Sequence, residues 1–189
     1  MNKTSPLLSK YQPEFIYGGI DGCVTTFAIV AGATGAHFHS NIIIVLGLAN
    51  LLADGLSMSI GSYLSSKADA HHYQKHKKIE YWSVENKPEE EINEIRMIYQ
   101  QKGFKGEMLE EIVKVITSRK HLWVDEMMKN ELKMMESLKS PIKKGLATYV
   151  SFITIGLIPL VVHLVDLFME DNKMTLFNIS CVLTLKKII

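Results

Sequence analysis

Two carboxylates of this sequence lie inside apolar segments, where charged residues are rare. Asp21 follows a run of apolar and small residues, and Asp54 lies in the middle of another. Residues 14–66 contain no Lys or Arg that could neutralise them. In a helix, Asn50, Asp54 and Met58 are spaced i, i+4 and i+8 and therefore share one face. Two carboxylates, an amide and a thioether could together line a pathway for a cation.

A charged side chain near the centre of a bilayer costs on the order of 2.5–3.5 kcal/mol on insertion scales. One alternative is that both acids are protonated or are capped by Thr25, Thr26 and Ser57. We favour a cation pathway, because two carboxylates neutralise a divalent ion. Met58 adds a soft ligand, which favours a transition metal over Mg²⁺ or Ca²⁺. Cys23 is another soft candidate, although a small buried thiol is the simpler interpretation.

The polar segment 63–145 carries a second group of possible ligands. Its acids and methionines are candidate metal ligands: Glu80, Glu91, Glu94, Met127, Met128 and Glu131. Glu91 and Glu94 are spaced i, i+3, which places them on one helix face. Carboxylates mixed with thioethers favour Fe²⁺-like ions over Ca²⁺. The alternatives are a solvated helix face for each Glu and a place in the apolar core for the two methionines.

Two histidines in the same polar segment offer a further possibility. His72 and His76 lie at i and i+4 within AHHYQKHKK, a spacing that can chelate a metal on a helix. A wet, Lys-rich surface near anionic lipid is the alternative that we favour.

Apolar runs long enough to cross a bilayer must position the membrane acids. A crossing needs about 20 residues, and the runs 15–36, 42–62 and 146–168 meet this length. The first two are joined by a short link and should form an antiparallel hairpin. Small residues in the first run, Gly18 and Gly22 among them, should allow close helix packing. A fourth run, 174–185, is short for a span.

The polar segment should be helical throughout. The second span should continue to about residue 82, and further helices are expected at 88–102, 105–117 and 121–138. The predicted fold class is therefore all-α: a polytopic α-helical membrane protein with a cytoplasmic three-helix insert between the second and third spans. The expected domains are a cytoplasmic N-terminal segment (1–14), the membrane hairpin (15–62), a metal-binding domain (63–145), and the third and partial fourth spans (146–189).

Basic residues predict the orientation. Lysines precede the first apolar run, occur at both ends of the polar segment and follow the fourth run, which are all on the same side of the membrane. The link between the first two spans contains no Lys or Arg. By the positive-inside rule, the N-terminus and the insert are cytoplasmic. Over the whole chain 21 Lys and Arg nearly balance 20 Asp and Glu. The net charge therefore gives no indication of a nucleic-acid partner.

Four motifs together resemble the vacuolar iron transporter family of ferrous iron–proton antiporters. They occur in the family's order across most of the chain, and they read DGCVTTFAIVAGATGA (21–36), LGLANLLADGLSMSIGSYLSSKAD (46–69), WVDEMMKNEL (123–132) and SFITIGLIPL (151–160). The resemblance implies a homodimer with its translocation path at the two-fold interface. It also implies a cytoplasmic helical domain that collects the metal.

Individual residues match the positions that the family uses. Asp21 and Met58 match its membrane pathway, and all six candidates of the polar segment match its cytoplasmic metal-binding positions. Two departures stand out: Asn50 replaces a Glu that some members carry, and Ser83 replaces a cytoplasmic Glu, with Glu85 nearby as a possible substitute. The family has five spans, whereas three clear ones and a short fourth are expected here.

We therefore expect a transporter that exports Fe²⁺ from the cytoplasm in exchange for protons, with Mn²⁺, Zn²⁺ and other divalent ions as alternatives. No prosthetic group and no enzyme activity are expected. The partners would be a second copy of the chain, the lipid bilayer, metal ions and protons. A non-transporting metal store or sensor, or an inactive truncated transporter, is the alternative. The expected location is a bacterial plasma membrane, or a vacuolar membrane in a eukaryote.

Overall fold

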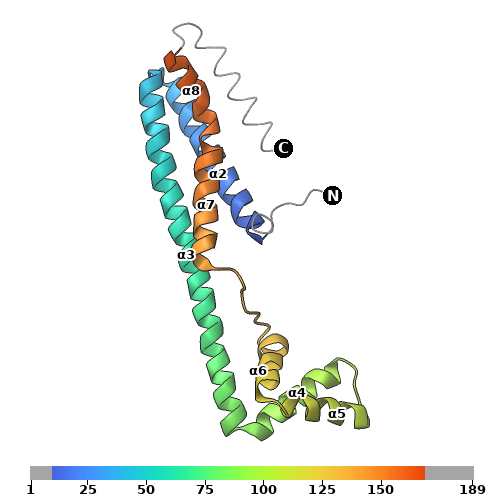
Figure 1. Cartoon of the computed structure of the whole chain (residues 1–189). Coiled ribbons are helices and arrows are strands. Elements are labelled where there is room, and N and C mark those ends of the chain that lie inside the picture. Colours follow the sequence, from blue (N-terminus) through green and yellow to red (C-terminus); the bar gives the residue numbers. More distant parts are fainter. Residues whose placement is uncertain (1–9, 169–189) are drawn as a thin grey trace. The chain divides into compact units, whose positions relative to one another are not determined.

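The computed structural model describes residues 10–168 of the chain (Figure 1). Within this range the chain is helical and contains no strand, which confirms the all-α prediction. The elements are α2 (Gln12–Gly35), α3 (Ser40–Asn86), α4 (Pro88–Gln101), α5 (Gly106–Thr117), α6 (Lys120–Glu126), the π-helix η1 (Met127–Glu131), α7 (Pro141–Gly156) and α8 (Ile158–Phe168). They form two compact units, which comprise residues 10–66 with 139–168 and residues 67–138.

Three helical segments of the described chain are long and apolar enough to cross a membrane. They are Gln12–Gly35, Ser40–Asn86 and Pro141–Val165, which confirms the three expected spans. The fourth expected run, 174–185, lies outside the described residues. Helix α3 contains 47 residues, as expected for a second span that continues without a break. At 1.5 Å per residue it is about 70 Å long, against about 30 Å of hydrocarbon, so only part of it can lie in the bilayer.

Helices α2 and α7 pack at backbone distance in the first unit. A Cβ atom added to Gly22 would lie 2.4 Å from the carbonyl oxygen of Phe152, and one added to Gly18 would lie 2.4 Å from the Ser151 hydroxyl. Any larger residue would separate the two helices. This is the close approach that the small residues predict. Gly32, farther along α2, has no atom from another part of residues 10–168 within 4 Å of such a Cβ.

The apolar core of the first unit joins all three spans. It is formed by buried side chains of α2, α3, α7 and α8: Val30, Ala33, Ile43, Leu51, Phe152 and Leu160. Met58 packs against this core from α3. The core therefore fixes the α3 segment that carries the predicted pathway residues.

The third span differs from its prediction at both its start and its middle. It begins at Pro141 instead of residue 146, because Pro is favourable in the first turn of a helix. Helix α7 then ends at Gly156, and α8 begins at Ile158. Pro159 lacks the N–H that would continue the α7 ladder, and the N–H groups of Leu160 and Val161 donate to the Leu157 carbonyl instead. The kink expected at Pro159 is thus a break between two helices.

The second unit has an apolar core of its own. Helix α5 buries Leu109, Val113 and Ile116, which lie at i, i+4 and i+7. The core contains, from all its helices, Val84, Ile95, Leu109, Val113, Ile116, Trp123, Val124, Met127 and Met128. Helix α4 begins at Pro88, as predicted, and Gly103 after its end has a φ of +98°.

The last predicted helix of the polar segment, 121–138, is too long. Helix α6 covers Lys120–Glu126, the π-helix η1 follows to Glu131, and residues 133–139 are not helical. The Leu132 N–H donates to the Met127 carbonyl at 3.2 Å, and Lys133 has a φ of +52°. A left-handed residue directly after a helix is a common way to end it. The hydrophobic pattern of residues 132–138 does not reveal this stop.

Candidate metal centre and membrane pathway

The predicted pathway residues of the first unit lie on two helices. Asp21 is on α2 and is half-buried, whereas Asp54 is on α3 and is exposed in the single chain. Asn50 and Met58 flank Asp54 on α3 and are half-buried. In the described part of the chain neither carboxylate forms an ion pair or a hydrogen bond with the other. The helix spacing of the α3 residues is as predicted, but the two acids are not brought into contact.

The hydroxyl groups proposed as caps do not serve the two carboxylates. The Thr25 hydroxyl donates to the backbone carbonyl of Asp21 at 2.8 Å. The Thr26 hydroxyl and the Asn50 Nδ2 are buried without a hydrogen-bond partner among residues 10–168. A buried polar group without a partner costs about 1–3 kcal/mol. The capping alternative therefore has no hydrogen bond to support it, and two buried groups lack a partner.

A cavity of about 520 Å³ adjoins Met58 in the first unit. It is lined by residues of α2, α3 and α7: Pro13, Glu14, Tyr17, Met58, Gly61, Ser62, Ser65 and Thr148. Met58 is the one lining residue that the sequence analysis singled out. The cavity thus combines one thioether, one carboxylate and several hydroxyl groups.

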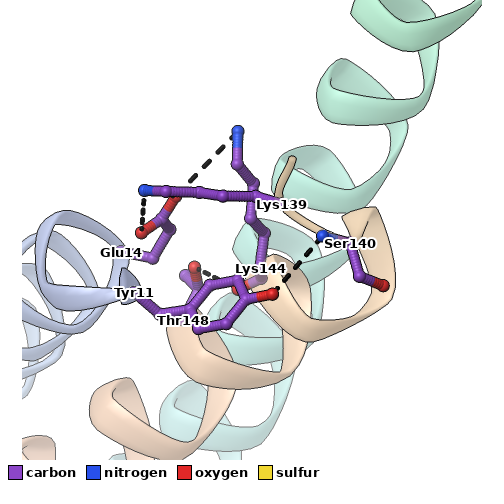
Figure 2. Close-up of polar contacts among 6 residues, drawn as sticks. All are labelled: Tyr11, Glu14, Lys139, Ser140, Lys144 and Thr148. Atoms are coloured by element: carbon purple, nitrogen blue, oxygen red, sulfur yellow. Dashed lines mark hydrogen bonds and ion pairs between the residues drawn. The ribbon is translucent and has the colours of Figure 1, made fainter. Parts of the chain in front are cut away.

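Glu14 forms an ion-pair group that the sequence analysis missed (Figure 2). Its carboxylate lies 3.2 Å from Lys139 Nζ and 3.9 Å from Lys144 Nζ, and its side chain is 13% exposed. The Ser140 backbone N–H donates to the Tyr11 hydroxyl at 3.3 Å beside this pair. The partners are 125 residues apart in sequence. A carboxylate in the first turn of a helix after Pro13 is the only local signal.

Four carboxylates that the sequence nominated converge in the second unit. Glu80 comes from α3, Glu91 and Glu94 from α4, and Glu131 from the end of η1. Glu80 and Glu91 are buried, each 7% exposed, whereas Glu131 is exposed. The Oε2 atom of Glu91 is buried and has no hydrogen-bond partner within residues 10–168. We call Glu80, Glu91, Glu94 and Glu131 the carboxylate cluster.

Burial and repulsion by neighbouring acids raise the pKa of Glu80, Glu91 and Glu131. Burial is the largest cause for Glu91, followed by the charges of Glu94, Glu80 and Glu90, and together they raise its pKa to about 7. The pKa of Glu131 also rises to about 7, first because protein atoms displace water from its carboxylate and then because Glu94 and other acids face it. Burial, then Glu94, raises the pKa of Glu80. Near neutral pH the cluster is therefore divided between protons and negative charge.

The cluster is more open than a coordination shell. In the described residues no three His, Cys, Asp or Glu side chains lie close enough together to hold a metal ion as they stand. Like charges repel, and a cation bound between the carboxylates would offset this repulsion and allow their oxygens to approach one another. Carboxylate oxygens suit hard and borderline divalent ions. The cluster has the chemistry of a metal site in which the ligands are separated.

The two predicted methionine ligands lie in the apolar core. Met127 and Met128 are fully buried and pack with Trp123 and Val124. Both belong to η1, and π-helical turns are frequent at functional sites. Their burial fits the alternative in which they are core residues, and a role as soft ligands stays a prediction.

Three further candidates have clear positions. Glu85, considered as a substitute for the Glu missing at Ser83, forms an ion pair with Lys120. Its carboxylate is therefore directed to a Lys side chain, and Ser83 is half-buried. Cys23 is completely buried, in agreement with a small core thiol.

Comparison with known proteins identifies relatives over most of the chain. The model of the VIT family matches residues 13–187. A vacuolar iron transporter of Toxoplasma gondii is 41% identical over 155 residues, which cover 80% of this chain and 51% of that protein. A vacuolar iron transporter of Plasmodium falciparum is 36% identical, with 77% and 55% covered. Vacuolar iron transporter 1 of Oryza sativa is 30% identical, with 89% and 68% covered. The chain spans about half the length of the first two relatives.

Proposed function

This chain belongs to the VIT family, and from that premise we propose that it transports Fe²⁺ across a membrane, out of the cytoplasm and in exchange for protons. Three apolar helices make it an integral membrane protein. Asp21 and Asp54, acids in two of these helices, support passage of a cation. Mn²⁺ and Zn²⁺ are further proposed substrates, because imidazole-free oxygen and thioether ligands discriminate weakly among divalent transition metals.

The observation that carries the proposal is the carboxylate cluster. Glu91 presents a buried oxygen without a hydrogen-bond partner in the described chain, and the charges of Glu94 and Glu80 act on its carboxylate. A divalent cation there would replace protons, since Glu91 and Glu131 have pKa values of about 7. The cluster would collect the ion, and Met127 and Met128 would add soft ligands after a local rearrangement.

In the membrane, the proposed path uses Asp21, Asn50, Asp54 and Met58. A carboxylate cannot bind a metal ion and a proton at the same time, so protons from the far side would release the ion. The Asn50 amide, which is buried without a partner in the described residues, would gain one from a hydrated ion or from a second subunit.

A homodimer is part of the proposal. Asp54 is exposed on α3 in the single chain, and a charged group facing lipid is costly. A second copy placed against this part of α3 would shield Asp54 from lipid.

We also propose which membrane contains this protein. The relatives named above come from eukaryotes and are called vacuolar. A vacuolar membrane therefore has more support than the bacterial plasma membrane predicted from the sequence. We propose no enzyme activity, because the family is a transporter family.

Uptake of Fe²⁺ into liposomes with an internal fluorescent chelator would test the proposal. With a pH gradient across the membrane and the protein oriented to transport into the liposome, liposomes that contain the wild-type chain should take up Fe²⁺. Liposomes that contain Asp21→Asn or Asp54→Asn should lose this uptake. Asp69→Asn is the matched control, because it removes an exposed acid from the same helix α3. Uptake that is unchanged in both membrane variants would contradict the proposal.

A metal store or sensor is the second candidate function. The observation in its favour is that the carboxylate cluster lies within one unit that has its own core. Stoichiometric Fe²⁺ binding by dimeric protein, without proton-coupled uptake into liposomes, would favour this candidate.

A further inference from the structure

Two histidine side chains on α3 face each other outside the carboxylate cluster. His72 Nε2 and His76 Nε2 lie 3.2 Å apart, whereas the ring centroids are 4.6 Å apart. Because the Nε2 atoms are closer to each other than the centroids, the Nε2 edges of the rings point toward one another. His72 is exposed and His76 is half-buried, so the pair is open to solvent.

This separation fits two imidazoles bound to one metal ion. Metal–nitrogen bonds of about 2.0–2.1 Å to both Nε2 atoms would enclose an angle of roughly 100° at the ion. Such an angle lies between the octahedral and tetrahedral values. Helices that bind zinc through two histidines use the same i, i+4 spacing. The helix itself therefore pre-organises both ligands.

A hydrogen bond between the rings is the arrangement without metal. One Nε2–H would donate to the lone pair of the other ring, and at 3.2 Å this bond is long. Within residues 10–168 neither imidazole has another hydrogen bond. The metal would take the place of the shared proton, and no other hydrogen bond would have to break.

The charges around the pair permit a cation. Asp69 precedes His72 by three residues and Glu80 follows His76 by four, so a carboxylate lies near each end on the same helix face. Lys77 is paired with Asp125 at 3.2 Å. Two further cations, Lys75 and Lys78, line a separate groove of about 620 Å³ with His71, Gln74 and Ile79.

We propose that His72 and His76 form a second metal site, with two imidazole ligands and water in the remaining positions. Imidazole nitrogen selects divalent transition ions such as Cu²⁺, Ni²⁺, Zn²⁺ and Fe²⁺ over Mg²⁺ and Ca²⁺. No third His, Cys, Asp or Glu of the described chain completes the shell. The ion therefore keeps coordination positions open to water and can dissociate into solvent. The site stands on the geometry of the pair and does not depend on transport.

Electron paramagnetic resonance of Cu²⁺ tests this site, because Cu²⁺ binds nitrogen ligands most strongly among these ions. The full, tag-free chain in detergent would receive one equivalent of Cu²⁺, and nitrogen couplings would count the bound imidazoles. The wild type should show two. His72→Ala and His76→Ala should lose the two-nitrogen signal, with an affinity at least about tenfold lower, the least that losing even an outer-shell partner usually costs.

Two controls separate this site from its neighbours. His71→Ala removes the adjacent histidine, and Glu91→Gln removes an acid of the carboxylate cluster, and both should keep the two-nitrogen signal. Far-UV circular dichroism would verify that His72→Ala and His76→Ala stay helical. His76→Gln, which keeps a polar side chain on α3, should lose the signal as His76→Ala does. A two-nitrogen signal that survives in His72→Ala and His76→Ala, that disappears in His71→Ala, or that is absent from the wild type would overturn the proposal.

Discussion

Replacing Glu91 by Gln should stabilise the metal-free second unit at pH 8. Burial and the neighbouring acids favour the protonated form of Glu91 in the folded state and raise its pKa from 4.5 to about 7. The folded state therefore binds the proton more tightly than the unfolded state. Stability is highest below pH 4.5, falls as the pH rises toward 7, and has lost this contribution above pH 7. Gln carries no charge at any of these pH values.

The size of the effect follows from the pKa. A rise from 4.5 to about 7 corresponds to at most about 3.4 kcal/mol at pH 8, at about 1.36 kcal/mol per pH unit. Part of this is repulsion from the charges of Glu94 and Glu80, which are coupled to that of Glu91, so the full value is an upper limit. We therefore expect a stabilisation of about 2 kcal/mol, or about 30-fold in the opening equilibrium. At pH 5 Glu91 is protonated when folded, and the difference should be small.

Hydrogen–deuterium exchange of α4 in the full chain would measure this effect. The wild type and Glu91→Gln would be compared in EDTA at pH 5 and at pH 8, so that the intrinsic exchange rate cancels at each pH. Glu89→Gln is the matched control, since Glu89 lies in the same first turn but is exposed. The reasoning is refuted if Glu91→Gln gains no more protection than Glu89→Gln at pH 8, or gains equally at both pH values.

Three other outcomes follow from the structure. Mn²⁺ added at pH 8 should restore exchange protection of α4 in the wild type, but not in a double variant that carries Glu91→Gln and Glu131→Gln. Glu14→Gln should lower the stability of the first unit by roughly 1–3 kcal/mol, because both lysines lose their ion pair with this carboxylate; thermal unfolding in detergent, with exposed Glu107→Gln as control, would measure it. Gly22→Val should abolish monodisperse protein in size-exclusion chromatography, whereas Gly32→Ala, with open space around it, should not.

The membrane helices could be predicted from the sequence because their signals are local. Length and hydropathy mark the spans, and the absence of Gly or Pro between residues 62 and 82 marks the continuation of α3. Helix α4 could be placed because Pro88 and three following acids suit a helix start. Pro159 explains why a break occurs near Leu157. The position of the break depends on which carbonyl accepts the hydrogen bonds of the following N–H groups. Helix packing determines this acceptor, and no local sequence pattern reveals it.

The candidate site could be predicted in part for a similar reason. Glu91 and Glu94 share a helix face, which their spacing reveals. Their approach to Glu80 and Glu131 requires the packing of α4 against α3 and η1, and spacing cannot supply it. The ion pair of Glu14 with Lys139 could not be predicted from local sequence patterns, because 125 residues separate the partners.

The π-helix η1 has a consequence for how this protein can vary. A single π turn accommodates one residue more than an α turn over the same arc, so everything after it is rotated by about 100° relative to an uninterrupted α-helix. Glu131, the last residue of η1, joins the other carboxylates from the end of this turn. Deleting one residue from Met127–Glu131 would restore a regular helix and turn the fourth carboxylate away. Among descendants of this chain, the length of that five-residue stretch should be more strictly preserved than the identity of its exposed members.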